Sequence, residues 1–295
     1  MEKQVKNYGR SIREKILNIT RDSGQKYQYM YLLARYFNER LLYRVSVSQY
    51  KDNFVLKGGS LLYALDGLDT RPTVDVDFLA EKISRDREYL EGVFREILSI
   101  PCEKDGVTFD VAHITSEPIT VEKKYPGTRF YITALMDTIV HNMSIDIGFG
   151  DVITPCPESV DFPMLIQDNP SINLQAYSIE TVIAEKFHTM IDRDVLNSRM
   201  KDFFDCYQIL TSKEVSKDTL QEAINATFSN RGLAHNDNLE LFTDSFRKDI
   251  VRIKRWEAFL KKIKWKKTIS FDEVMNVIEK NLKPLMDEYW KIVEQ

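Results

Sequence analysis

Apolar residues recur with helical spacing at both ends of the chain and alternate with polar residues through much of its middle. Before residue 50, an isoleucine and leucine stripe over 12–19 and an aromatic-rich run over 29–43 predict two helices. After residue 53, the pattern predicts a helix near 85–98 and strands over 73–79, 107–114, 129–135 and 142–149.

The rest of the chain has a different pattern. The proline-containing stretch 155–170 is typical of a linker or crossing segment, and beyond Ser178 the apolar spacing is helical. This order predicts an α+β protein with N-terminal helices, a small mixed sheet and a helical C-terminal domain, divided into residues 1–165 and 166–295. A chain of 295 residues with 43% hydrophobic residues can bury cores for two such domains.

One run in the first half of the chain carries its most distinctive chemistry, and it reads KGGSLLYALDGLDTRPTVDVDF. At its end Val74, Val76 and Phe78 share one face of the predicted strand, whereas Asp75 and Asp77 share the other. Two like charges directed into one small volume are costly unless a cation or solvent occupies it. Mg²⁺ prefers carboxylate and phosphate oxygens, so the pair predicts a magnesium site for a phosphate-bearing substrate.

The start of the same run predicts an anion-binding turn. Lys57, Gly58, Gly59 and Ser60 lead from a short apolar strand into a helix. Glycines permit close backbone approach, Ser60 can act as the N-cap or as a first-turn hydroxyl, and the helix start attracts phosphate. Each half also has an ordinary interpretation, as a helix cap or as a solvated strand face, and Lys57 can simply face water. Their order and proximity favour a nucleoside triphosphate site.

These residues carry a family resemblance. The pattern GG-S, a spacer and R-x-T-x-D-x-D-F resembles the first motif of the nucleotidyltransferase-like toxins of the AbiEii/AbiGii group, within the DNA polymerase beta type nucleotidyltransferase superfamily. The chain supplies it with Gly59, Ser60, Arg71, Thr73, Asp75, Asp77 and Phe78. The spacer is longer than in the minimal superfamily pattern, so we expect a loop over 66–72. The resemblance implies a nucleotidyltransferase core, an NTP substrate and a place for Arg71 at the nucleotide.

A third carboxylate on a neighbouring strand is implied by the same resemblance, and the matching residue is Asp146. Apolar and polar residues alternate over 142–149, which predicts a strand with one apolar face and Asp146 on the other. Without the resemblance, the favoured interpretation of Asp146 would be an ordinary aspartate on the solvated face of a strand. Asp151, just past a glycine turn, is the rival ligand and is expected in a loop.

Two later segments resemble further motifs of the family. The segment around Lys186 resembles its AEK motif, which implies a lysine that reaches the nucleotide phosphates, and the plain alternative is a surface lysine. The segment from Arg199 to Asp202 resembles its R-x-K-D motif. By this resemblance Arg199 and Lys201 bind phosphate, and Asp202 orients a basic side chain or acts as a base. Ordinary helix charges and salt bridges compete with this interpretation, and for Asp205 we favour them.

The implied mechanism is nucleotidyl transfer assisted by one or two Mg²⁺ ions. Asp75, Asp77 and Asp146 would hold the metal, which neutralises the triphosphate and activates the acceptor hydroxyl. Positioning and electrostatics dominate such reactions, so cations from a second lobe are expected to matter as much as the carboxylates. The cations expected around a cleft between the lobes are Lys57, Lys186, Arg199 and Lys201.

A basic tract over residues 247–267 is the clearest candidate for contact with a polyanion. It contains 10 basic and 2 acidic residues, with Trp256, Phe259 and Trp265 interleaved, although the whole chain has a net charge of −4. The competing interpretation is an amphipathic helix whose aromatic residues are core and whose lysines are solvated. Under the first interpretation the RNA-binding residues are Arg255, Lys261, Lys262, Lys264, Lys266 and Lys267.

The family resemblance also implies a biological setting. It implies a toxin of a bacterial toxin–antitoxin or abortive-infection system that acts in phage defence, a cognate antitoxin, and an RNA acceptor such as tRNA. Two alternatives stay open: a nucleotidyltransferase that modifies a protein side chain, and a nucleotide- or antitoxin-binding protein without catalysis. The first would not need the basic tract, and the presence of all three carboxylates argues against the second.

Other sequence features narrow the class of protein. No apolar run is long enough to span a bilayer and the N-terminus lacks a signal-peptide core, so we expect a cytoplasmic protein without a membrane partner. Three isolated cysteines and four histidines without ligand spacing argue against a disulfide framework and a zinc site.

Overall fold

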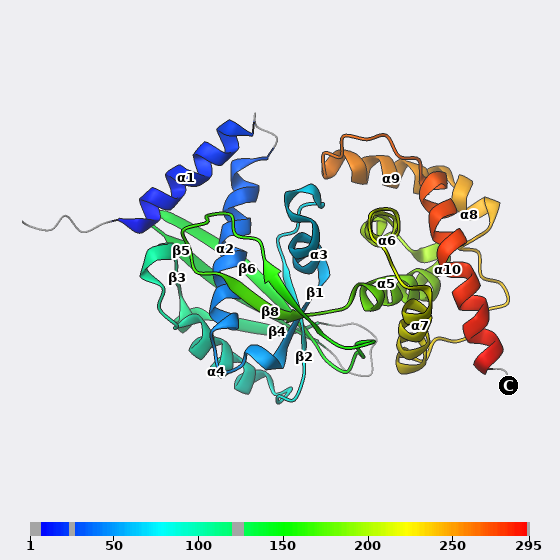
Figure 1. Ribbon diagram of the computed structural model, residues 1–295, viewed down its shortest axis with the longest axis horizontal. Coiled ribbons are helices and arrows are strands. Elements are labelled where there is room, and N and C mark those ends of the chain that lie inside the picture. Colours follow the sequence, from blue (N-terminus) through cyan, green and yellow to red (C-terminus); the bar gives the residue numbers. More distant parts are fainter. Residues whose placement is uncertain (1–6, 24–26, 120–126, 294–295) are drawn as a thin grey trace, which may run out of the picture. The chain divides into compact units, whose positions relative to one another are not determined.

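The computed structural model describes residues 7–23, 27–119 and 127–293. The chain forms two compact units (Figure 1). The sheet unit runs up to Gly150 and also includes Glu158–Ala176, whereas the helical unit consists of Asp151–Pro157 and the chain from Tyr177 onward. The sheet unit therefore extends beyond residue 165, because one strand (Glu158–Phe162) lies within the proline-containing stretch 155–170 and another (Ile172–Ala176) follows it.

One mixed sheet is the centre of the sheet unit, as the sequence predicts. Its strand order is β3-β5-β6-β2-β1-β8-β7, and β4 also pairs with β5. β1 pairs in parallel with β8, and β2 with β6, whereas the remaining pairs are antiparallel. The described strands are β1 (Phe54–Lys57), β2 (Val76–Ala80), β3 (Thr108–Phe109), β4 (Thr115–Ile119), β5 (Gly127–Met136), β6 (Ile139–Gly148), β7 (Glu158–Phe162) and β8 (Ile172–Ala176).

The four strands predicted by alternation correspond to β2, β3, β5 and β6, with different ends. β2 begins only at Val76, and Val74 is 57% exposed, so its predicted place on the buried face is wrong. The reason is that residues 70–75 form an irregular connection rather than part of the strand. The stretch 107–114 yields only β3 and a 3₁₀ turn at Val111–His113, and β4, β7 and β8 are strands that the sequence pattern did not predict.

Helices cover the sheet and build its core. They are α1 (Tyr8–Asp22), α2 (Tyr29–Ser46), α3 (Gly58–Asp66) and α4 (Arg87–Leu98). α2 contacts β6, β8 and α4, while α3 contacts β1 and β2 (Figure 1). The ring of Phe54 lies 5.7 Å from that of Phe78 and 5.3 Å from that of Phe94, between centroids, so strands and α4 share one aromatic core.

α2 is a buried helix that carries charged side chains into the core. Glu39 and Arg40 form a fully buried ion pair at 2.6 Å, and Arg44 binds Asp105 at 2.8 Å. The guanidinium carbon of Arg35 lies 3.2 Å from the ring centroid of Tyr63 on α3. Buried charges persist only when they are paired or stacked in this way. α2 thereby fixes the position of α3, the helix that follows the Lys57 turn.

The helical unit contains the helices predicted beyond Ser178. They are α5 (Ile179–Arg193), α6 (Met200–Ser212), α7 (Lys217–Arg231), α8 (Asp244–Lys248), α9 (Ile250–Lys262) and α10 (Phe271–Val293). Ser178 caps α5, because its hydroxyl accepts a hydrogen bond from Thr181 N at 3.3 Å. Phe203, Phe204 and Trp256 are buried among these helices. Among the described helices, none combines the length and apolar character needed to cross a membrane.

Candidate active site

Four charged residues lie side by side across neighbouring strands of the sheet. In the strand register Lys57 on β1 pairs with Asp77 on β2, Asp77 pairs with Asp146 on β6, and Asp146 pairs with Arg129 on β5. Residues paired in register point to the same face of a sheet. The sheet therefore presents two adjacent carboxylates with one cation on each side. We call Lys57, Asp77, Asp146 and Arg129 the charged row.

Asp75 stands next to this row, one residue before β2 begins. Its Oδ1 accepts a hydrogen bond from the Ser144 hydroxyl at 2.9 Å. Its carbonyl oxygen accepts from the Ser60 hydroxyl at 3.1 Å, and the Asn38 side chain donates to the carbonyl of Val74 at 3.1 Å. The donors belong to β6, α3 and α2. They hold Val74 and Asp75, which precede β2 and are not part of the sheet. The fixed backbone directs Asp75 toward β6.

The turn between β1 and α3 requires glycine for two reasons. Gly58 has φ +67°, in the left-handed region that side chains other than glycine rarely adopt. A Cβ at Gly58 would also collide with Asp77 Oδ2, and one at Gly59 would lie 2.5 Å from Thr73 Oγ1. The backbone at Gly58 can approach Asp77, and the backbone at Gly59 can approach Thr73, only because neither residue has a side chain. The glycine pair thus brings the start of α3 directly to the charged row.

Ser60 takes the second of its two predicted roles. The N-cap of α3 is Lys57, without a side-chain cap, and Ser60 is a completely buried first-turn residue that donates to Asp75 O. Arg71 lies in the connection between α3 and β2, which forms the loop expected from the long spacer. The motif residues are therefore gathered at one end of β1 and β2.

Arg129 is a member of the row that the sequence did not predict. Its Nε and Nη2 donate to Asp146 Oδ1 and Oδ2 at 2.7 and 2.6 Å. This hydrogen bonding, more than any other influence, raises the pKa of Arg129. The alternation predicted around Asp146 is confirmed, since Met143, Ile145 and Ile147 are buried while Asp146 is not. Only the register of β5 against β6 reveals the partner of Asp146.

The carboxylates of the site differ in their fit to Mg²⁺. Asp75 and Asp77 supply hard carboxylate oxygens of the kind that magnesium binds. Asp146 is different, because both of its oxygens already accept from Arg129. Accordingly, no three carboxylate, histidine or cysteine side chains in the described part of the chain converge as a metal site. The residues fit a cation at Asp75 and Asp77, and Asp146 can join them only if Arg129 moves away.

The motif residues of the helical unit form a closed ion-pair cluster. Lys186 Nζ donates to Asp202 Oδ1 at 3.1 Å and to Asp205 Oδ2 at 2.7 Å, and Arg199 Nε donates to Asp202 Oδ2 at 2.6 Å. Burial alone would raise the pKa of Asp202, but Lys186 and Arg199 outweigh it and lower that pKa to about 2. Asp205 lies in a salt bridge as expected, whereas Lys186 is only 13% exposed and is no surface lysine.

The remaining candidates in this unit differ in their surroundings. Asp202 orients Lys186 and Arg199, which is one of its two predicted roles. Lys201, the residue before it on α6, is exposed. Asp151 lies in a loop and binds Arg231 at 2.8 Å, and Arg231 also binds Glu185. Burial would lower the pKa of Arg231, but these two carboxylates raise it. A tight structural ion pair therefore accounts for Asp151, the rival to Asp146.

Comparisons with known proteins decide the family. The family model described as "Nucleotidyl transferase AbiEii toxin, Type IV TA system" matches residues 40–277. The chain belongs to the AbiEii family. It is thus a nucleotidyltransferase toxin of a type IV toxin–antitoxin system, and membership implies an NTP substrate and a cognate antitoxin. This result favours the enzyme over the non-catalytic binding protein.

Two solved structures resemble this AbiEii-family protein in fold. JHP933 from Helicobacter pylori is 16% identical, with a TM-score of 0.51 and coverage of 90% of this chain and 96% of that chain. A crystal structure of a nucleotidyltransferase candidate from H. pylori is 17% identical, with a TM-score of 0.51 and coverage of 90% and 99%. A comparison with curated proteins finds no match.

The basic tract of the AbiEii-family chain contains α9 and the segment after it. Trp256 is buried against Phe271, with centroids 5.8 Å apart, and Trp265 packs edge-on against Phe204 at 5.0 Å. Trp256 is thus part of the core, as the competing interpretation holds, whereas Phe259 and Trp265 are half-buried and pack on Phe204. The basic side chains themselves are exposed, namely Arg255, Lys261, Lys262, Lys264, Lys266 and Lys267.

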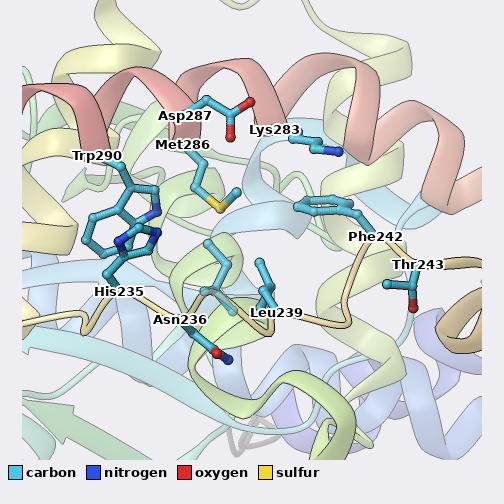
Figure 2. A pocket seen from close by; sticks show the side chains of 10 residues that line it. His235, Asn236, Leu239, Phe242, Thr243, Lys283, Met286, Asp287 and Trp290 are labelled. Carbon is cyan, nitrogen blue, oxygen red and sulfur yellow. The ribbon is translucent and has the colours of Figure 1, made fainter.

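A cavity of about 250 Å³ lies elsewhere in the helical unit (Figure 2). Lys283, Met286 and Trp290 of α10 line it together with the segment after α7, where His235 stacks on Trp290 at 4.7 Å. None of the residues predicted for the active site lines this cavity. It is also smaller than the roughly 300–1,000 Å³ of ordinary small-molecule pockets.

Proposed function

We propose that this nucleotidyltransferase binds an NTP with Mg²⁺ at the charged row and transfers a nucleotide to an RNA acceptor. The observation that carries the proposal is the adjacency of Asp77 and Asp146 in register, beside the Gly58–Gly59 turn. Two neighbouring carboxylates on one sheet face repel each other unless a cation lies between them. The uncapped start of α3 adds backbone N–H groups and a positive dipole end for phosphate.

In the proposed mechanism Asp75 and Asp77 hold Mg²⁺, and Asp146 completes the set when it is released by Arg129. Bound Mg²⁺ would neutralise triphosphate charge and lower the pKa of the acceptor hydroxyl. Lys57, next to Asp77, attracts the phosphates, and the glycine turn lets the backbone approach them closely. Gly59, Ser60 and Arg71 are proposed to lie around the nucleotide, and Ser60 would act by holding the backbone of Asp75.

The helical unit is proposed to contribute to phosphate binding through its exposed cations. Arg199 is 41% exposed and is oriented by Asp202, and Lys201 is exposed on the same helix start. Lys186 is proposed to act with Asp202 by fixing Arg199, since both Lys186 and Arg199 bind the same carboxylate. A planar guanidinium held in one orientation suits bidentate contact with phosphate.

RNA is proposed as the acceptor because of the basic tract. Exposed lysines on α9 and after it supply the charge needed for phosphate contacts, without sequence readout. Trp256 is buried, and the rings of Phe259 and Trp265 pack against Phe204, so we propose that binding there is mainly electrostatic. Transfer to a protein side chain is the competing proposal, because it needs the charged row but not the tract.

Incubation with each labelled NTP, Mg²⁺, total RNA and cell-extract protein tests the proposal. We expect label in RNA, its loss on chelation of Mg²⁺, and its loss in Asp77→Asn. Label in protein instead would support the competing acceptor and refute RNA. Label that persists in folded Asp77→Asn would refute the charged row as the site of transfer.

A further inference from the structure

The guanidinium of Arg129 engages the whole carboxylate of Asp146. Both carboxylate oxygens of Asp146 accept from one guanidinium at 2.6 and 2.7 Å, the bidentate geometry of the strongest ion pairs. The two residues are direct register partners on β5 and β6, so their backbones cannot drift apart without opening the hairpin. A cation that binds Asp75 and Asp77 therefore meets an Asp146 that is already neutralised.

The Arg129 side chain can leave Asp146 without disturbing the core. It is 37% exposed, and its strand neighbours Phe130 and Ile132 are the residues buried beneath the sheet. Besides Asp146, the side chain lies near Tyr131 and within electrostatic reach of Asp75. A guanidinium fork fits a phosphate as well as it fits a carboxylate.

We propose that Arg129 is a positioning residue that exchanges Asp146 for a phosphate oxygen when the nucleotide binds, and so withholds the third carboxylate from metal until then. The inference rests on the proposed function of the charged row. Without nucleotide, the pair keeps Asp146 from a free divalent cation. With nucleotide, the triphosphate offers Arg129 a second anion and brings a cation for Asp146. After the exchange, Arg129 is paired with the phosphate and Asp146 with the cation, so neither side chain loses a partner of opposite charge. The nucleotide thereby favours the state in which the Arg129–Asp146 pair is open.

The consequence is an opposite effect of Arg129 on the two ligands. Arg129→Gln releases Asp146, so Mn²⁺ should bind about tenfold more tightly in the absence of nucleotide. The same variant lacks the phosphate contact, so its affinity for an NTP analogue in the presence of metal should fall about tenfold. A residue with a merely structural role would weaken both affinities or neither. Arg129→Lys, which keeps the charge but not the fork, should fall between wild type and Arg129→Gln.

Calorimetry with Mn²⁺ alone, and then with a non-hydrolysable NTP analogue, measures both affinities on the full chain. The matched control is Arg95→Gln, which removes a similarly exposed guanidinium paired to Glu91 at 3.3 Å and should change neither. In the Asp146→Asn background, Arg129→Gln should no longer raise Mn²⁺ affinity, because the released carboxylate is missing.

Unchanged Mn²⁺ affinity in Arg129→Gln would overturn the exchange, and so would an increase that persists in Asp146→Asn. If Arg129→Gln does not fold, equal Mn²⁺ affinities for Arg129→Lys and wild type would overturn it. Asp77→Asn separates this outcome from failure of the proposed function. Loss of Mn²⁺ binding in Asp77→Asn with no effect of Arg129→Gln would refute only the exchange, whereas wild-type binding in Asp77→Asn would refute the metal site itself.

Discussion

The two acidic clusters of the chain neutralise their charge in different ways. In the helical unit, Asp202 and Asp205 are buried and bind Lys186, and Arg199 adds a second cation. In the sheet unit, Asp75, Asp77 and Asp146 are only partly buried and share a sheet face with two cations, Lys57 and Arg129. The first cluster balances two negative with two positive charges, and the second has an excess of one negative charge.

This difference separates a buried cluster that is mainly structural, in which Arg199 is the member exposed enough to meet a phosphate, from a site whose carboxylates can take a cation. Buried and balanced charges hold each other in place, and the loss of one leaves its partners uncompensated. A half-exposed cluster with excess negative charge gains free energy from an added cation and can exchange partners with a substrate. We therefore expect substitutions in the sheet cluster to change activity more than stability, and substitutions in the helical cluster to do the reverse.

The largest effect is expected for Asp77→Asn. Asparagine keeps the shape but removes the charge that holds the cation, so the rate of nucleotide transfer should fall by roughly 10³-fold. The free energy of unfolding should change by less than about 1 kcal/mol, because the removed charge is one of an excess of like charges. Transfer assays with urea unfolding measure both quantities. Asp161→Asn, on the exposed face of β7, is the matched control. Full activity of Asp77→Asn would contradict the assignment of the sheet cluster as the one that acts in nucleotide transfer.

Lys186→Met should have the next largest effect, on stability. Methionine fills a similar volume but leaves Asp202 and Asp205 without their shared cation, which should cost about 3 kcal/mol of unfolding free energy. Chemical denaturation measures the change. Lys201→Met, at an exposed position of α6, is the control and should alter stability by less than about 0.5 kcal/mol. Equal stability of the two variants would contradict a structural role for the buried cluster.

The sequence predicts the sheet cluster better than its partners. Alternation placed Asp146 on the polar face of β6 because one face of that strand is apolar, a local property. It did not predict the Arg129 pair, which depends on the register of β5 against β6. That register follows from the turn at Asp137 and Thr138 between paired Met136 and Ile139.

The turn itself gave no sequence signal. Asp137 has φ +53°, which aspartate tolerates, but Thr138 rather than glycine follows it, so the hairpin lacks the Asn-Gly or Asp-Gly pair by which short turns are recognised. β8 was missed for another reason. It is a short strand that follows several prolines, and it is stabilised by parallel pairing with the distant β1. Non-local pairing of this kind is not visible in a local pattern.

The burial of Lys186 could not be derived from helical periodicity either, because it depends on α6 packing against α5. The motif resemblance identified Lys186, Arg199 and Asp202 as a group, and the structure joins them in one cluster. The sequence therefore predicts which residues belong together more readily than what they bind.

The helical cluster should also make stability depend on pH. The pKa of Asp202 is about 2 in the folded protein, below its ordinary value of 3.8, so its ion pairs stabilise the fold fully above that ordinary value. The contribution, about 2 kcal/mol, is lost as the pH falls through the folded pKa. The stability difference between wild type and Asp202→Asn, measured by urea unfolding from pH 6 to pH 2, should shrink accordingly. A difference that stays constant over this range would show that the Asp202 carboxylate is not stabilised by its cations.

The smallest effect is expected in the basic tract, at the exposed lysines of α9 and of the segment after it. Changing four lysines there to glutamine should weaken RNA binding about tenfold and flatten its salt dependence, at unchanged stability; the positions are Lys261, Lys262, Lys266 and Lys267. Affinity measured across salt concentrations tests this. The control makes the same change at four lysines outside the tract, namely Lys213, Lys217, Lys280 and Lys291. Equal RNA affinity and salt slope in both variants would remove the tract from acceptor binding. Because these lysines lie outside both acidic clusters, that outcome would leave the metal site intact and favour a protein side chain as the acceptor.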